Sequence, residues 1–142
     1  MDKKSILIVD DDKAILEGFK ALLETKKYKV STAESGRDAL EKICNNFYNL
    51  ALIDLKLPDM EGTDLLLEFR QLQPAIKTIV VTGYSTRENA ISSLNLGANG
   101  YLEKPVTPGK LLAVVADKLS EQETENKLYE DTVNELLKAR TQ

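Results

Sequence analysis

Short apolar runs alternate with segments of helical periodicity along most of this chain. Runs rich in aliphatic and β-branched residues predict strands over residues 5–10, 28–33, 50–55, 76–82 and 99–103. Between them, apolar residues recur three and four positions apart, which predicts helices over residues 12–26, 36–47, 63–72 and 85–96. This alternation predicts an α/β fold, a doubly wound five-stranded parallel sheet with helices on both faces.

Several predicted helix ends carry recognisable signals. Ser35 can cap the helix over 36–47, because its hydroxyl can accept a hydrogen bond from the first turn. Ser85 and Glu88 match a capping box at the start of the helix that ends near Leu96. Gly97 is the predicted stop of that helix, since glycine readily adopts the left-handed conformation found there.

From about Thr107 onward the chain is predicted to form one long helix, whose apolar part should pack on the sheet. The composition becomes polar and acidic beyond Ser120, so we divide the chain into a domain over 1–120 and a helical extension or linker over 121–142. A heptad register passes through Val115, Leu119, Gln122, Asn126, Tyr129, Val133, Leu136 and Arg140. Two central positions are polar, which weakens the coiled-coil signal. A solvated tail and a signalling helix toward a partner both stay open.

Composition narrows the class of protein. The 142 residues suit one domain, and the net charge of −4 argues against a nucleic-acid surface on this chain. No run approaches the length of a membrane span or a secretory signal, so we expect a cytoplasmic protein without membrane contact. The single cysteine, Cys44, excludes an internal disulfide and is expected in the core. Histidine is absent, which excludes His-based triads and His-ligated zinc.

Polar residues suited to chemistry lie at the carboxyl ends of four of the five predicted strands: Asp10, Asp11, Asp54, Thr82 and Lys104. The carboxyl ends of parallel strands share one edge of the sheet, where ligands bind, so these side chains should converge. Grouped carboxylates repel each other unless a cation is present, and oxygen ligands favour Mg²⁺ or Mn²⁺. In the alternative, Asp12 caps the next helix and its neighbours are solvated loop acids.

These residue types suit phosphoryl transfer. A carboxylate can attack a phosphoryl donor and form an aspartyl phosphate. The reaction needs charge neutralisation and positioning more than covalent help. A cation on Asp11 and Asp54 would hold one phosphoryl oxygen, and Lys104 and Thr82 could contact the others.

Four motifs resemble the receiver domain of two-component response regulators. They are ILIVDDD at 6–12, ALIDLKLPDMEG at 51–62, IVVTG at 79–83 and GANGYLEKP at 97–105. Their order and spacing extend the resemblance over about residues 4–120. It implies a flavodoxin-like sheet with strand order 2-1-3-4-5, followed here by an extended C-terminal helix.

The resemblance also implies a set of metal and phosphoryl contacts. Asp54 would be the phosphoacceptor and would bind the metal, Asp11 would bind it directly, and Asp10 directly or through water. The backbone carbonyl of Lys56 would be a further metal ligand. Thr82 and Lys104 would contact the phosphoryl group, which a histidine kinase or phosphotransfer protein would supply.

Further implied features concern switching. Tyr101 matches the switch aromatic, which turns inward as Thr82 moves toward the phosphate, and the Lys104–Pro105 bond is expected to be cis. Lys56 and Tyr84 occupy the rate-tuning positions, and their bulk predicts slow self-dephosphorylation unless both side chains point to solvent. The output face corresponds to residues 86–119. That face and the C-terminal helix could form a homodimer.

The preferred function is therefore a phosphorylation-dependent signalling domain that catalyses only its own phosphorylation and dephosphorylation. One alternative is an aspartate-nucleophile phosphatase of the haloacid-dehalogenase type, because Asp10 to Asp12 contains Asp-x-Asp. Ala14 stands where that family has Thr or Val, and the late acidic pair and cap insertion are missing. A constitutive binding module without phosphorylation is the third hypothesis, which the intact set of acids disfavours.

Overall fold

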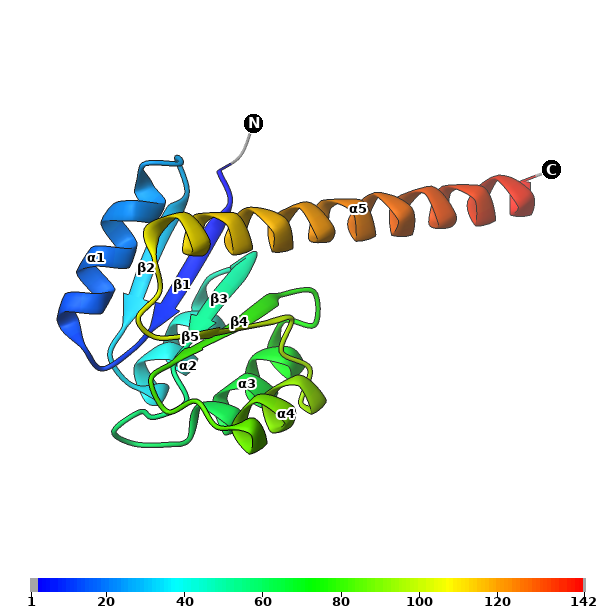
Figure 1. Ribbon diagram of the computed structural model, residues 1–142. Coiled ribbons are helices and arrows are strands. Elements are labelled where there is room, and N and C mark those ends of the chain that lie inside the picture. Colours follow the sequence, from blue (N-terminus) through cyan, green and yellow to red (C-terminus); the bar gives the residue numbers. More distant parts are fainter. Residues whose placement is uncertain (1–2, 142) are drawn as a thin grey trace.

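A computed structural model, which describes residues 3–141, shows a parallel sheet between two layers of helices (Figure 1). The strands are β1 (Ser5–Val9), β2 (Lys29–Ala33), β3 (Leu50–Ile53), β4 (Lys77–Thr82) and β5 (Gly100–Glu103). They pair in the order β2-β1-β3-β4-β5, and every neighbouring pair is parallel. The predicted doubly wound, flavodoxin-like fold is confirmed.

The helices follow the strands in the predicted order. They are α1 (Lys13–Glu24), α2 (Gly36–Asn45), α3 (Gly62–Leu72), α4 (Arg87–Asn95) and α5 (Pro108–Thr141). Helices α1 and α5 cover one face of the sheet, and α2, α3 and α4 cover the other (Figure 1). The helices thus bury both faces of the sheet, which explains why its central strands are largely apolar and almost fully buried.

The core consists of two apolar clusters, one on each face of the sheet. Successive residues of a strand point to opposite faces, so β1 sends Leu7 and Val9 into one cluster and Ile6 and Ile8 into the other. All four side chains are at most 1% exposed. This alternation fixes the register of β1 between its two neighbours, because a one-residue slip would exchange the two faces.

In helix α2, the prediction that Cys44 lies in the core was wrong. Cys44 is exposed and lies outside both apolar clusters. The buried face of α2 is set by Ala39 and Ile43, which are four residues apart, and the next position is rotated about 100° away from that face. The helix also ends at Asn45, two residues before the predicted end.

The prediction for the start of α4 was also wrong. Thr86 is the N-cap, and its hydroxyl oxygen accepts a hydrogen bond from the backbone N–H of Asn89 at 3.0 Å. The capping box predicted from Ser85 was therefore wrong by one residue. Two other signals are confirmed: Ser35 caps α2, and Gly97 follows α4 with a φ of 95°.

Helix α5 has 34 residues and continues well beyond the sheet (Figure 1). Its first part packs on the sheet as predicted, through the buried residues Leu111, Val115 and Leu119. Among residues 3–141, no helix is both long and apolar enough to cross a membrane.

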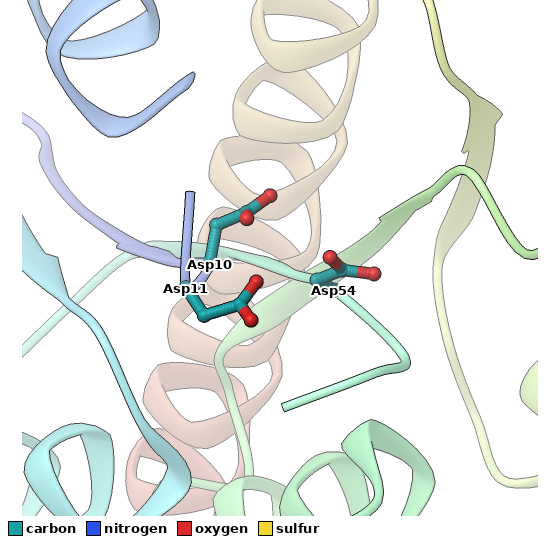
Figure 2. A group of neighbouring side chains, drawn as sticks. All are labelled: Asp10, Asp11 and Asp54. Atoms are coloured by element: carbon teal, nitrogen blue, oxygen red, sulfur yellow. The ribbon is translucent and has the colours of Figure 1, made fainter. Parts of the chain in front are cut away.

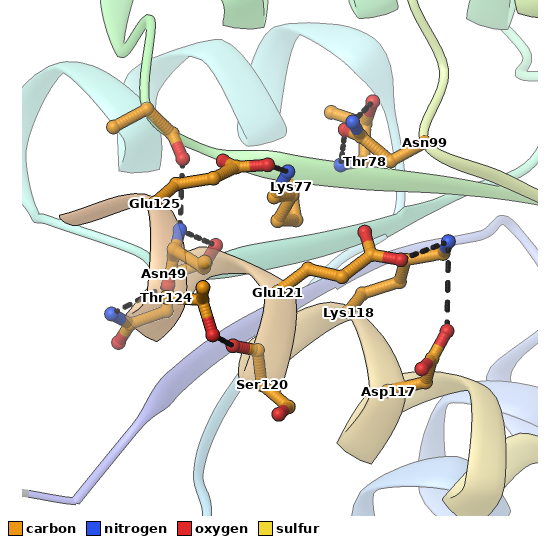
Figure 3. A network of polar contacts seen from close by, with 12 residues as sticks. Asn49, Lys77, Thr78, Asn99, Asp117, Lys118, Ser120, Glu121, Thr124 and Glu125 are labelled. Atoms are coloured by element: carbon orange, nitrogen blue, oxygen red, sulfur yellow. Dashed lines mark hydrogen bonds and ion pairs between the residues drawn. The ribbon is translucent and has the colours of Figure 1, made fainter. Parts of the chain in front are cut away.

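Polar contacts then hold α5 against the amino-terminal ends of the strands. Gln122 is only 2% exposed, and its Nε2 donates to the backbone carbonyls of Asn49 and Ala75 at 2.8 Å each. The buried Lys77 forms an ion pair with Glu125 at 2.9 Å (Figure 3). Gln122, one of the two polar heptad positions, therefore faces its own sheet.

Candidate functional site

Parallel register brings three carboxylates together at one edge of the sheet. Val9 of β1 pairs with Ile53 of β3, so the residues that follow both strands are neighbours. The backbone N–H of Asp54 donates to the carbonyl of Val9 at 3.0 Å. One carboxylate oxygen from each of Asp10, Asp11 and Asp54 lies within 4.8 Å of the other two (Figure 2).

Two of these acids are buried. Asp10 is 3% exposed and Asp54 is 4% exposed, whereas Asp11 is open to solvent. Burial raises the pKa of Asp10, and the negative charge of Asp54 adds to that effect, although hydrogen bonds from Lys104 and from the backbone of Asp12 oppose it. The cluster of Asp10, Asp11 and Asp54, called the acidic site below, is therefore electrostatically unfavourable unless positive charge lies beside it.

Lys104 supplies a positive charge to this site. It follows β5, where its backbone N–H donates to the carbonyl of Thr82 at 2.9 Å. Its Nζ lies 2.6 Å from Asp10 Oδ2 and 3.1 Å from Asp54 Oδ2. Burial by itself lowers the pKa of Lys104, but the hydrogen bonds and charges of the two aspartates outweigh it, and the net pKa is raised. The Lys104–Pro105 peptide bond is cis, as expected.

Thr82 ends β4 at the same edge and is fully buried. Its Oγ1 accepts a hydrogen bond from the backbone N–H of Tyr84 at 3.0 Å. The half-buried Tyr101 packs against the core, and its hydroxyl donates to Ser85 Oγ at 3.2 Å. Movement of Thr82 toward a phosphoryl group and inward rotation of Tyr101, which the resemblance to receiver domains implies, would have to break these two hydrogen bonds.

Lys56 and Tyr84, the two residues expected to tune the rate, are exposed. The Lys56 side chain is 51% exposed, and its Nζ pairs with Glu61 at 3.4 Å. Tyr84 is 59% exposed. Both side chains therefore reach mainly into solvent, the alternative that the sequence left open, and the shielding of an acyl phosphate stays a prediction.

The loop between β3 and α3 contains two features that sequence reasoning missed. A Cβ at Gly62 would overlap the backbone carbonyl oxygen of Asp54, so glycine is needed where α3 begins against the acidic site. The second feature is a contact from Asp59 to α2. The only signal in the sequence was a glycine closing a turn-rich stretch, and nothing local pointed to Asp59.

The sequence model of the response regulator receiver domain matches residues 6–116. The chain belongs to this family. It is a receiver domain of two-component signal transduction, and the family of aspartate-nucleophile phosphatases finds no support in these comparisons.

Two groups of curated relatives illustrate its similarity. The receiver is 38% identical to the transcriptional regulatory protein ZraR of Escherichia coli K12 over 119 residues, which are 84% of this chain and 27% of ZraR. It is 35% identical to the alginate biosynthesis transcriptional regulatory protein AlgB of Pseudomonas putida over 114 residues, 80% of this chain and 25% of AlgB. The chain thus spans about a quarter of the length of these relatives.

Solved structures show the same architecture. A CheY-like receiver domain protein from Methanospirillum hungatei is 52% identical with a TM-score of 0.85, covering 87% of this chain and 99% of that one. A response regulator from Burkholderia pseudomallei is 28% identical with a TM-score of 0.77, covering 89% and 75%. The latter structure contains a phosphorylated aspartic acid and a calcium ion.

The receiver's acidic site has the chemistry of a divalent-cation site. Mg²⁺, Mn²⁺ and Ca²⁺ prefer oxygen ligands, and three carboxylates supply them within 4.8 Å of one another. The raised pKa of Asp10, which burial chiefly causes, shows that further positive charge would be favourable there. The residues present therefore fit such an ion.

Proposed function

We propose that this receiver accepts a phosphoryl group on Asp54 from a histidine kinase or phosphotransfer protein. The observation that carries the proposal is the position of Lys104 Nζ, which lies 2.6 Å from Asp10 and 3.1 Å from Asp54. A nucleophile, a fixed cation and two further acids thus share one site. Positioning and charge neutralisation of this kind are what phosphoryl transfer requires.

In the proposed reaction, a carboxylate oxygen of Asp54 attacks the phosphorus atom of a phosphohistidine. The new O–P bond forms as the P–N bond breaks, and the imidazole nitrogen of the donor keeps the electron pair. Lys104 pairs with one phosphoryl oxygen, since its Nζ already contacts Asp54 Oδ2. The hydroxyl of Thr82, which is free to donate while it accepts from Tyr84, hydrogen-bonds another.

Asp10, Asp11, Asp54 and the backbone carbonyl of Lys56 would hold Mg²⁺ or Mn²⁺. When bound, the ion neutralises negative charge on the phosphoryl oxygens. The backbone N–H of Lys56 donates to Asp54 Oδ1 at 3.4 Å, so the backbone of this residue already lies against the phosphoacceptor.

Phosphorylation would then act on the face formed by residues 86–119. A phosphoryl group adds charge and new acceptors at the sheet edge. Movement of Thr82 toward it would release Tyr101 from Ser85, 3.2 Å away, and let the aromatic ring turn inward. Thr82 ends β4, Ser85 lies between β4 and α4, and Tyr101 lies in β5, so the change would reach the face that α4 and β5 form.

The C-terminal helix offers a surface for homodimerisation. Val133 lies about five turns after the buried Val115, so the side of α5 that covers the sheet continues along the extension. Tyr129 is 72% exposed and Leu136 63% exposed on that side. We infer that residues 121–142 serve as a helical extension to the domain over 1–120 and contact a second copy. An oligomeric state that stays unchanged with an acyl-phosphate mimic would contradict this.

We further propose that the receiver acts in the cytoplasm and catalyses only its own phosphorylation and dephosphorylation. ZraR and AlgB are transcriptional regulatory proteins, and the receiver covers about a quarter of each. Its net charge of −4 supports the narrower proposal that this chain itself does not contact nucleic acid.

Labelling with acetyl phosphate and Mg²⁺ tests the proposed function. Wild type should gain the mass of one phosphoryl group, and Asp54→Asn should gain none because the nucleophile is removed. Asp64→Asn, which removes an exposed acid from α3, is the matched control and should be labelled like wild type. Equal labelling of Asp54→Asn would contradict the proposal. An unlabelled wild type would favour a constitutive binding module.

A further inference from the structure

Asp59 ties the loop between β3 and α3 to the beginning of α2. Its Oδ1 accepts a hydrogen bond from the backbone N–H of Gly36 at 2.8 Å, and its Oδ2 accepts one from Arg37 at 2.9 Å. The carboxylate therefore caps a helix that begins 23 residues earlier in the chain. These are long-range contacts, and no local turn requires them.

The cap is shared between Asp59 and Ser35. Ser35 Oγ accepts from the backbone N–H of Asp38 at 3.1 Å, and the Ser35 carbonyl accepts from Ala39 at 3.0 Å. Since Asp59 takes the two remaining donors, the first turn of α2 is fully hydrogen-bonded. An anion at this end of a helix also interacts favourably with the helix dipole.

The charged form of Asp59 is the one that holds this contact. Hydrogen bonds from the backbones of Arg37 and Gly36 lower the pKa of its carboxyl group. Asp59 is therefore an anion at neutral pH, and it can accept from both backbone donors at once.

Met60 adds a packing contact at the same place. A Cβ on Gly36 would overlap Met60 Sδ, so the absence of a side chain at Gly36 lets Met60 lie against the helix. Met60 is partly buried against the apolar cluster that contains α2 and α3. The tip of the loop is thus docked on α2 by an anion and by an apolar side chain.

The other end of the loop is joined to the acidic site. The backbone N–H of Lys56 donates to Asp54 Oδ1 at 3.4 Å, and Lys56 also forms an isolated antiparallel bridge with Glu61. Gly62 donates its backbone N–H to the Leu55 carbonyl at 2.8 Å. Only Leu57 and Pro58 lie between Lys56 and Asp59, so the Lys56 peptide and the docked tip belong to one short segment.

We propose that Asp59 is a positioning residue, which holds the Lys56 backbone carbonyl where it can join Asp11 and Asp54 around a divalent cation. This inference rests on the proposed function. Asp59 is not among the residues that would hold the cation or contact the phosphoryl group. It acts through the loop, in the way that residues behind metal ligands orient them.

The test combines Mg²⁺ titration by calorimetry with amide hydrogen exchange of the metal-free protein. Asp59→Ala should bind Mg²⁺ about tenfold more weakly than wild type. Exchange at the Gly36 and Arg37 amides should become faster without Mg²⁺. Phosphorylation by acetyl phosphate should return close to the wild-type rate at saturating Mg²⁺, because the reacting groups are intact.

Asp59→Asn keeps the shape of the side chain and one acceptor, so its Mg²⁺ affinity should lie between those of wild type and Asp59→Ala. The Mg²⁺ affinity of this variant tests the proposal if the alanine variant fails to fold. Glu41→Gln removes the same charge from an exposed position on α2 and is the control. Wild-type Mg²⁺ affinity in both Asp59 variants would overturn this inference alone. A wild type that binds no Mg²⁺ would overturn the proposed metal site as well.

Discussion

Lys104 Nζ lies 3.1 Å from Asp54 Oδ2, although 50 residues separate the two in the chain. The same Nζ lies 2.6 Å from Asp10 Oδ2. Burial raises the pKa of Asp10. One lysine therefore compensates two buried carboxylates. Its positive charge offsets the repulsion between them.

Lys104→Met should lower the free energy of unfolding by about 2 kcal/mol without Mg²⁺, because two buried acids lose their cation. The expected cost is below that of a fully buried pair, since the Lys104 side chain is 18% exposed. Urea denaturation with and without Mg²⁺ measures it, and Mg²⁺ should restore part of the loss. Lys13→Met is the control, because its side chain is 76% exposed and its ion pair is weak. Equal losses in both variants would contradict the prediction.

Mg²⁺ should stabilise the native protein by mass action. At a concentration one hundred times the Kd, the free energy of unfolding should rise by about 2.7 kcal/mol. Asp11→Asn should lose most of this gain and cost little by itself, because Asp11 is exposed. Asp12→Asn should keep the gain, because Asp12 is not one of the three clustered acids and its side chain caps α1, which asparagine can also do. Thermal unfolding at several Mg²⁺ concentrations checks both variants.

Replacement of Lys56 and Tyr84 by alanine tests whether these residues shield the acyl phosphate. If they exclude water from Asp54, the double variant should lose phosphate faster than wild type. The rate is measured by mass spectrometry after removal of the donor. A longer lifetime in the double variant would refute shielding. An unchanged lifetime would fit side chains that are 51% and 59% exposed.

The lowered pKa of Asp59 predicts how the stability of the protein depends on pH. Its pKa is lower in the folded protein than in the unfolded chain, so its contribution to stability is present above about pH 3.9. The contribution is lost as the pH falls through the native-state pKa. Wild type should therefore be more stable than Asp59→Asn at neutral pH, and the difference should shrink in acid. A difference that stays constant down to low pH would rule out this linkage.

Gln122→Ala should lower the free energy of unfolding by about 1–3 kcal/mol, since the carbonyls of Asn49 and Ala75 lose the hydrogen bonds that the buried Gln122 side chain donates. Asn126→Ala, at an exposed position one turn further along α5, should change it little. Chemical denaturation of the full chain compares the two. Equal stability would show that the hydrogen bonds of Gln122 do not hold α5 to the sheet.

Local patterns predicted most of the fold. The apolar runs predicted the central strands β1, β3 and β4, because residues buried on both faces of a parallel sheet cannot alternate with polar ones. The edge strands β2 and β5, which are only partly buried, were predicted as well. The failures occurred where tertiary contacts decide. Cys44 looked apolar within its helix, yet Ala39 and Ile43 took the buried face. Ser85 was a good cap by sequence, but Thr86 caps α4 and Ser85 contacts Tyr101.

The sequence by itself determined that acids and a lysine would follow strands, and parallel pairing then required them to share an edge. It also carried the motifs that place the chain among receiver domains. Only the tertiary structure decided that Lys104 contacts both Asp10 and Asp54, that Asp59 caps α2 and that Gln122 faces the sheet. The physical reason is that strand and helix periods report on neighbouring residues. The partner of a buried or capping polar group is fixed by packing between segments that lie far apart in the chain.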